Sequence, residues 1–96
     1  MAAYFVFHNR FCEGQTLDDY LPKALESMAP YSHEIIIADE NSEVIEGSSD
    51  LPRTIVIKFE SRSDATAWYN SPEYRAVLPL RLAATEGFTV LVDGLG

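Results

Sequence analysis

The first thirty residues change from an apolar run to a helical pattern. Residues 3–11, AYFVFHNRF, begin as a nearly unbroken apolar run, which is typical of a strand buried on both faces. The following apolar residues recur at helical spacing and predict a helix: Leu17, Tyr20, Leu21, Ala24, Leu25 and Met28. Thr16 and Asp19 have the spacing of a capping box, whereas Pro22 lacks the amide hydrogen that an interior helical position donates. We therefore expect the helix either to kink at Pro22 or to begin later.

The middle of the chain has the pattern of β-structure. The runs HEIIIADE (33–40) and RTIVIKF (53–59) are rich in β-branched residues and predict two strands. Between them, SEVIEG (42–47) predicts a short extended piece after a bend, and GSSDLP (47–52) predicts a turn. A hairpin with a long connection follows from this order.

Two helix starts are visible in the second half. Ser61 with Asp64 again has capping-box spacing and begins a helix that we expect to end near residue 69. Ser71 followed by Pro72 starts another, because it offers an N-cap hydroxyl and a proline at the first helical position. Gly87 is the expected end of this second piece.

The order of elements predicts the fold. With residues 88–94, FTVLVDG, as the last strand, the order is β-α-β-β-α-β, and the second helix is broken near residues 70–71. This order is typical of a ferredoxin-like α+β domain with a four-stranded antiparallel sheet. The 96 residues suit a single domain spanning 1–96.

Apolar residues on both faces of the strands predict a dimer. Two helices cover only one face of such a sheet, so the other face of a monomer should be polar. Alternation instead places apolar side chains on both faces: Tyr4 and Val6 against Phe5 and Phe7, and Ile35 and Ile37 against Ile36 and Ala38. A bare patch of this size is unusual on a monomer. We expect two copies to pack sheet against sheet as a homodimer.

Composition limits the partners and the compartment. The net charge is −8, the pI is near 4.5, and the seven basic residues form no run. Nucleic acids and anionic membranes are therefore not expected as partners, because phosphate binding needs a basic footprint. Cys12 is the single cysteine, so no internal disulfide forms. No basic region precedes the amino-terminal apolar run, which ends at His8, too soon for a signal peptide or a membrane span; this indicates a cytoplasmic protein.

His8 and Arg10 are the first candidates for chemistry. Imidazole has a pKa suited to proton transfer near neutrality, and Arg10 lies two residues on, on the same strand face, where it would anchor an anion. Asp93 ends the last strand and would assist His8 if the first and last strands are neighbours. The alternative is structural: His8 is an interface or core histidine, and the other two are charges at strand ends. No metal-ligand spacing and no glycine-rich phosphate loop is present, so no cofactor is expected.

The segment AWYNSPEYRAVLPLR (67–81) surrounds the helix break. Its structural interpretation is a joint in which Asn70 takes the irregular position and two helix faces are buried, the second by Tyr74, Val77, Leu78 and Leu82. Arg81 then lies at the solvent or cleft margin. In the functional interpretation the joint also roofs a ligand cavity lined by Trp68, Tyr69, Asn70 and Tyr74.

Several segments resemble a known family. EVIEG, PRTIVIKFES, AWYNSPEYRAVLPLRLAA and VLVDG are similar to the domain-of-unknown-function family 1330, of the dimeric α/β-barrel superfamily. The resemblance spans roughly residues 43–94, and WYNSPEY is its most specific part. Ser32-His33 stands where the family often has a glycine pair. The resemblance implies a homodimer whose two four-stranded sheets face each other as a barrel. It implies no activity, because the superfamily includes monooxygenases, isomerases and decarboxylase-like enzymes without a common catalytic motif.

Two functional hypotheses follow. In the first, the protein is a homodimer of unknown molecular function that binds a small molecule and performs no chemistry, since no complete catalytic constellation is visible. In the alternative, it is a cofactor-independent enzyme acting on a small organic acid or aromatic. That enzyme would use His8 as base, Arg10 or Arg53 as anion anchor, and Trp68, Tyr69 and Tyr74 as the apolar wall. A purely structural dimerisation module is a third, weaker idea.

Overall fold

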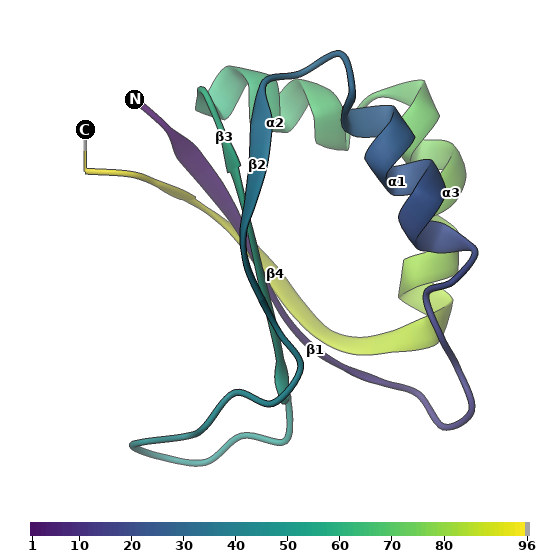
Figure 1. Cartoon of the computed structure of the whole chain (residues 1–96), viewed down its shortest axis with the longest axis vertical. Helices are drawn as coiled ribbons and strands as arrows, with labels where there is room; N and C mark the ends of the chain where they lie inside the picture. Colours follow the sequence, from purple (N-terminus) through teal and green to yellow (C-terminus); the bar gives the residue numbers. More distant parts are fainter. Residues whose placement is uncertain (96) are drawn as a thin grey trace.

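The computed structural model describes residues 1–95 and contains four strands and three helices over that range (Figure 1). In chain order they are β1 (Ala3–Phe11), α1 (Tyr20–Met28), β2 (His33–Asp39), β3 (Arg53–Phe59), α2 (Arg62–Tyr69), α3 (Pro72–Ala84) and β4 (Thr85–Asp93). This order confirms the predicted α+β arrangement with a broken second helix. Within this range no helix combines the length and apolar character that a bilayer span requires.

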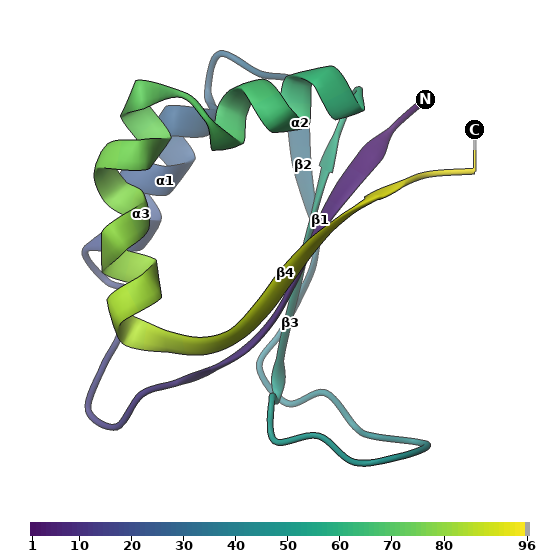
Figure 2. The same ribbon diagram turned by 180° about the vertical axis from the view of Figure 1, so that it is seen from behind.

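The four strands form one antiparallel sheet in the order β2-β3-β1-β4. This is the strand order of a ferredoxin-like fold, and β1 and β4 are neighbours, as the prediction for Asp93 required. All three helices lie on the same side of the sheet, and the long loop between β2 and β3 extends to the opposite side (Figures 1 and 2). One sheet face is therefore covered by helices and the other is not.

Helix α1 begins later than the hydrophobic pattern suggests. Its first residue is Tyr20, so Pro22 lies in the first turn, where its missing amide hydrogen has no intrahelical acceptor to lose. Asp19 occupies the N-cap position without a side-chain capping hydrogen bond, and Thr16 Oγ1 accepts from the amide of Asp18 instead. The later start is therefore the right alternative, and the capping box predicted from Thr16 and Asp19 is wrong.

The two later helix starts follow their local sequence closely. Ser61 Oγ accepts from the amide of Asp64 at 3.1 Å, and Ser71 Oγ accepts from the amide of Tyr74 at 3.2 Å. Pro72 is the first residue of α3, and Asn70 is the irregular residue between the helices. Both caps and the joint are confirmed.

Replacing Ser71 with alanine is expected to lower the free energy of unfolding by about 1–2 kcal/mol, because an N-cap hydroxyl is lost. Ser71 Oγ also donates to the carbonyl of Trp68 at 2.7 Å, so the substitution affects both sides of the joint. Urea unfolding at fixed protein concentration measures this. Ser63→Ala, at an exposed position of α2, is the control and should change stability by less than about 0.5 kcal/mol; equal losses would contradict the capping role.

Helix α3 ends at Ala84 and not at Gly87. Thr85 is already extended, and it pairs with Phe11 as β4 joins β1. Gly87 has φ +147° and lies opposite Asn9, where an added Cβ would be 2.1 Å from the carbonyl oxygen of His8. Its glycine therefore allows close approach of two strands, and the predicted helix stop was wrong.

A β-bulge in β2 corrects the predicted strand faces. Ile35 pairs with Ile57 and Ile37 pairs with Val56, so Ile36 is an extra residue. Alternation is reset there, and Ile35 and Ala38 share the helix-covered face of the sheet although the simple period of two separated them. Residues 42–47 form no strand and belong to the loop between β2 and β3.

The uncovered side of the sheet, here called the open face, is apolar at its centre. Register places Ile37, Val56, Val6 and Val90 side by side across the four strands. Phe88 and Val92 lie on either side of Val90 on the same face. The exposed fractions of these three residues are 40–54%. The covered face instead packs against the helices in a core that includes Phe5, Phe7, Phe59, Trp68 and Tyr74. The prediction of apolar side chains on both sheet faces is confirmed.

Candidate functional site

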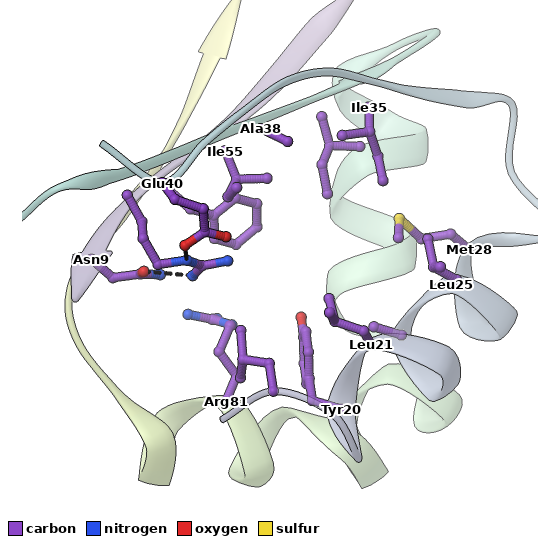
Figure 3. A pocket seen from close by; sticks show the side chains of 15 residues that line it. Asn9, Tyr20, Leu21, Leu25, Met28, Ile35, Ala38, Glu40, Ile55 and Arg81 are labelled. Atoms are coloured by element: carbon purple, nitrogen blue, oxygen red, sulfur yellow. Dashed lines mark hydrogen bonds and ion pairs between the residues drawn. The ribbon is translucent and has the colours of Figure 1, made fainter. Parts of the chain in front are cut away.

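A cavity of about 210 Å³ lies between α1 and the helix-covered face of the sheet (Figure 3). Fifteen residues line it: Phe7, Asn9, Leu17, Tyr20, Leu21, Ala24, Leu25, Met28, Ile35, Ala38, Glu40, Arg53, Ile55, Ile57 and Arg81. Three of them are charged. Their distribution gives the cavity two chemically different ends.

The apolar end opens between α1 and β2. Leu21, Leu25 and Ile35 line it and are 44–47% exposed. Leu25 and Met28 face Ile35 across the cavity in Figure 3. Large aliphatic side chains that remain half-exposed around an opening favour contact with apolar material rather than water. The mouth of the cavity is therefore apolar.

The polar end contains a neutralised arginine. Arg53 Nη1 donates to Asn9 Oδ1 at 2.7 Å, and its Nε donates to Glu40 Oε2 at 2.9 Å. The guanidinium also lies 4.7 Å from the ring centre of Phe11. Arg53 and Asn9 are buried, whereas the side chain of Glu40 is 61% exposed. Because Glu40 balances it, Arg53 contributes no net charge.

Arg81 is the second cation at this end and is 7% exposed. Its Nε donates to the hydroxyl oxygen of Tyr74 at 3.3 Å, and its guanidinium lies 5.1 Å from the ring centre of Phe7. Among residues 1–95 no carboxylate forms an ion pair with it. Burial lowers the pKa of Arg81, but the oxygens of Tyr74 and then Tyr20 outweigh burial, and the pKa is raised overall. Arg81 is therefore a buried, permanently charged group with no counterion among the described residues.

Tyr20 links α1 to this cation. Its hydroxyl lies 2.6 Å from the hydroxyl of Tyr74, and Figure 3 shows the Tyr20 oxygen directed into the cavity. Burial, followed by the contact with Tyr74, raises the pKa of Tyr20, so its hydroxyl stays protonated near neutral pH. The polar end thus combines cations with a neutral hydroxyl.

Asn9 and Arg81 also form a wall shared with a second cavity, of about 240 Å³, on the β4 side. Tyr69, Thr85 and Phe88 are among its other lining residues. Arg81 therefore borders two cavities.

The residues predicted as a site lie on both faces of the sheet. His8 is on the open face, where its ring is 5.4 Å from that of Phe88 and its Nδ1 is 3.3 Å from Thr54 Oγ1. Arg10 is exposed at the strand end, where the hydrogen bond to Glu86 and the charge of Asp50 raise its pKa. Of the predicted residues only Arg53 lines the cavity next to α1.

The remaining predicted residues lie in the core or at the surface, except Tyr69. Trp68 and Tyr74 are fully buried, and Trp68 Nε1 donates to Ser27 Oγ at 3.0 Å. Asn70 accepts from Arg75 at the helix joint, and Asp93 pairs with Arg62 at 2.9 Å. Asp93 pairs in register with Ala3, far along β1 from His8. Tyr69 lines the second cavity beside Arg81.

Sequence reasoning missed Arg81, Tyr20, Asn9 and Glu40 as members of one site. Arg81 was expected at the margin of α3 and Leu82 within its buried face, but Arg81 is buried and Leu82 is 60% exposed. A signal was present: Tyr74, Leu78 and Arg81 follow the i, i+4, i+7 spacing of one helix face. Within the described residues, no cluster of three or more His, Cys, Asp and Glu side chains is arranged to hold a metal.

The fold is similar to several solved structures. A protein of unknown function from Rhodopseudomonas palustris has a TM-score of 0.79 at 13% identity, over 99% of this chain and 83% of that one. A cofactor-independent oxygenase from Streptomyces nogalater has 0.59 at 12% identity, over 99% and 94%. A dimeric ferredoxin-like protein of unknown function from Thermobifida fusca has 0.57 at 12% identity, over 98% and 92%. These likenesses show the shared fold alone.

Sequence comparison gives a family. No curated protein matches the chain. The family model described as "Domain of unknown function (DUF1330)" matches residues 2–95, almost the whole chain, and includes the WYNSPEY run at the helix joint. The chain therefore belongs to this family of unknown molecular function, with a ferredoxin-like fold.

Proposed function

We propose that the protein is a homodimer that binds a small organic acid with an apolar tail in the cavity between α1 and the sheet. The observation that carries this proposal is Arg81, a buried cation at the end of an apolar cavity, without an ion-pair partner among the described residues. A buried charge is costly unless it is paired, and a ligand carboxylate would pair with it.

The cavity suits a small amphiphile. Its volume of about 210 Å³ lies below the roughly 300–1,000 Å³ of pockets for drug-sized ligands. The carboxylate would lie among Arg81, Tyr20 and Arg53, and the tail would run past Leu25 and Ile35 toward the mouth. This orientation leaves the polar head in the interior, where it has hydrogen-bond donors.

The open face supports the dimer. Its row of Ile37, Val56, Val6 and Val90 is not covered by any helix, and the β2–β3 loop on the same side carries the exposed Val44 and Ile45 (Figures 1 and 2). The Thermobifida fusca protein of similar fold is dimeric, which favours the same arrangement here. The sedimentation mass in solution should be near twice the chain mass of 10.7 kDa.

The enzyme alternative has less support. The Streptomyces nogalater oxygenase shares a fold with this chain at 12% identity, and fold alone carries no chemistry. His8, the hypothetical base, lies on the open face, whereas Arg53 lines a cavity on the other face. Arg10, the other proposed anion anchor, is already paired with Glu86 and Asp50. Binding without chemistry needs only the groups that line the cavity.

Replacing Arg81 with methionine is expected to weaken octanoate binding on the order of 10- to 100-fold, because a charge-assisted hydrogen bond is lost. Isothermal titration calorimetry measures the dissociation constant directly. Arg75→Met is the matched control, since it removes the same charge from an exposed position of α3. Octanoate binding by the wild type should also exceed hexanoate binding by about fourfold per added methylene, from roughly 0.8 kcal/mol per buried group. Equal losses in both variants, or affinity independent of chain length, would contradict the site.

A further inference from the structure

We infer that the polar end of the α1 cavity is an oxyanion site for a single negative charge, and that Glu40 sets its preference for a monocarboxylate over a dianionic head such as a phosphate monoester. This inference rests on the proposed function and specifies the ligand of that same cavity. Three features carry it: the charge balance of the lining, the direction of a hydrogen-bond chain, and the position of Glu40.

The charge balance leaves one positive charge for a ligand. Arg53 and Arg81 are the cations that line the cavity, and Glu40 is its carboxylate. Glu40 Oε2 forms an ion pair with Arg53 Nε at 2.9 Å, whereas Arg81 has no carboxylate partner among the described residues. A monocarboxylate bound against Arg81 would neutralise the site. A dianion would leave one uncompensated negative charge beside Glu40, whose carboxylate repels it.

A hydrogen-bond chain orients one neutral donor toward the ligand. Arginine only donates, so Tyr74 oxygen accepts from Arg81 Nε at 3.3 Å. Tyr74 is fully buried, and the partner shown for its own hydrogen is the Tyr20 oxygen, 2.6 Å away. Because a buried hydroxyl hydrogen needs an acceptor, we assign Tyr74 as the donor to Tyr20. The Tyr20 hydrogen is then left to point into the cavity, where its oxygen is directed in Figure 3. An anionic oxygen in the cavity would accept that hydrogen.

Glu40 is placed to select by charge without supporting the core. It follows β2 at the start of the long loop, and its side chain is 61% exposed although its carboxylate reaches the buried Arg53. Asn9 Oδ1 accepts from Arg53 Nη1 at 2.7 Å, so Arg53 keeps one fixed contact if the carboxylate is removed. Substitution of Glu40 should therefore change the charge of the polar end while the fold is retained.

The experiment compares octanoate with octyl phosphate, which share a tail and differ in head charge. Wild-type protein is expected to bind octanoate more tightly by calorimetry at a pH where the phosphate carries nearly two charges. Glu40→Gln is expected to raise octyl phosphate affinity on the order of tenfold, since a second cation is released, and to raise octanoate affinity by less, because a single negative charge gains less from that cation. Glu60→Gln is the matched control, at the opposite end of β3 from Arg53, and should leave the affinity ratio unchanged.

Tyr20→Phe tests the hydroxyl donor independently. Removing only the oxygen should weaken octanoate binding on the order of 10- to 100-fold, the effect of one hydrogen bond to a charged group. The same substitution should reduce the affinity for octanol by a smaller factor, because octanol carries no charge.

Different results would contradict the organic-acid site and its preference for a single charge. If octanoate shows no chain-length-dependent binding to the wild type, the proposed function is wrong and this inference with it. If octanoate binds as proposed but the ratio of octyl phosphate to octanoate affinity is the same in wild type and Glu40→Gln, the single-charge site is overturned alone. A wild-type preference for octyl phosphate would overturn it as well.

Discussion

Replacing Trp68 with alanine is expected to lower the free energy of unfolding by about 3–5 kcal/mol, the range for truncating a large buried aromatic residue. Trp68 is fully buried, and its ring centre lies 5.5 Å from that of Phe5, 5.3 Å from Phe59 and 4.1 Å from Tyr74. The substitution therefore removes contacts with β1, β3 and α3 at once. It also removes the indole donor to Ser27, which ties α2 to α1.

Urea unfolding of both proteins measures this loss. Because a dimer's apparent stability depends on concentration, the two proteins must be compared at equal concentration. Trp68→Phe is the informative control: it keeps an aromatic ring among Phe5, Phe59 and Tyr74 but lacks the donor, so its loss should be smaller. A loss below about 1 kcal/mol for Trp68→Ala would mean that the aromatic cluster is not the centre of the core.

Features of the fold that depend on residues close together in the sequence were predictable. Ser61 and Ser71 cap their helices through an amide three residues later, and Pro72 fits the first helical position by its own backbone geometry. Gly87 shows the limit. Its local context resembles a helix stop, but its actual role is set by the backbone of His8 across the sheet, nearly eighty positions away. The bulge at Ile36 is similarly fixed by pairing with β3 and not by the residues of β2 alone.

The candidate site was less predictable, because burial of polar residues depends on tertiary structure. Arg53 was named as an anion anchor and does line the cavity. Arg81 lies on α3, whose apolar residues are spread widely enough that more than one face could be buried. Whether Arg81 or Leu82 is buried depends on how α3 packs against α1. His8 was a candidate for its chemistry, and the strand period alone does not say which sheet face holds a cavity. Pairing of Tyr20 with Tyr74 joins residues 54 positions apart, a contact that no local pattern encodes.

Replacing Val90 with glutamate is expected to convert the proposed dimer to a monomer. Val90 lies next to Val6 in the apolar row at the centre of the open face. In a two-fold interface each substitution occurs twice, so two carboxylates would be buried against apolar residues without partners, at a cost of several kcal/mol. Sedimentation at micromolar concentration should then give a mass near 10.7 kDa instead of twice that value.

The monomeric variant should still be folded, since Val90 is 41% exposed in the single chain and a carboxylate there remains hydrated. Far-ultraviolet circular dichroism checks this. Leu82→Glu is the matched control, because it adds the same charge at a 60% exposed position of α3 on the helix side of the molecule, and it should remain dimeric. The α1 cavity lies on that helix side, away from the open face, so a folded Val90→Glu monomer should still bind octanoate. A Val90→Glu protein that keeps the dimer mass would instead show that the copies associate through another surface, and the apolar row would need a different partner.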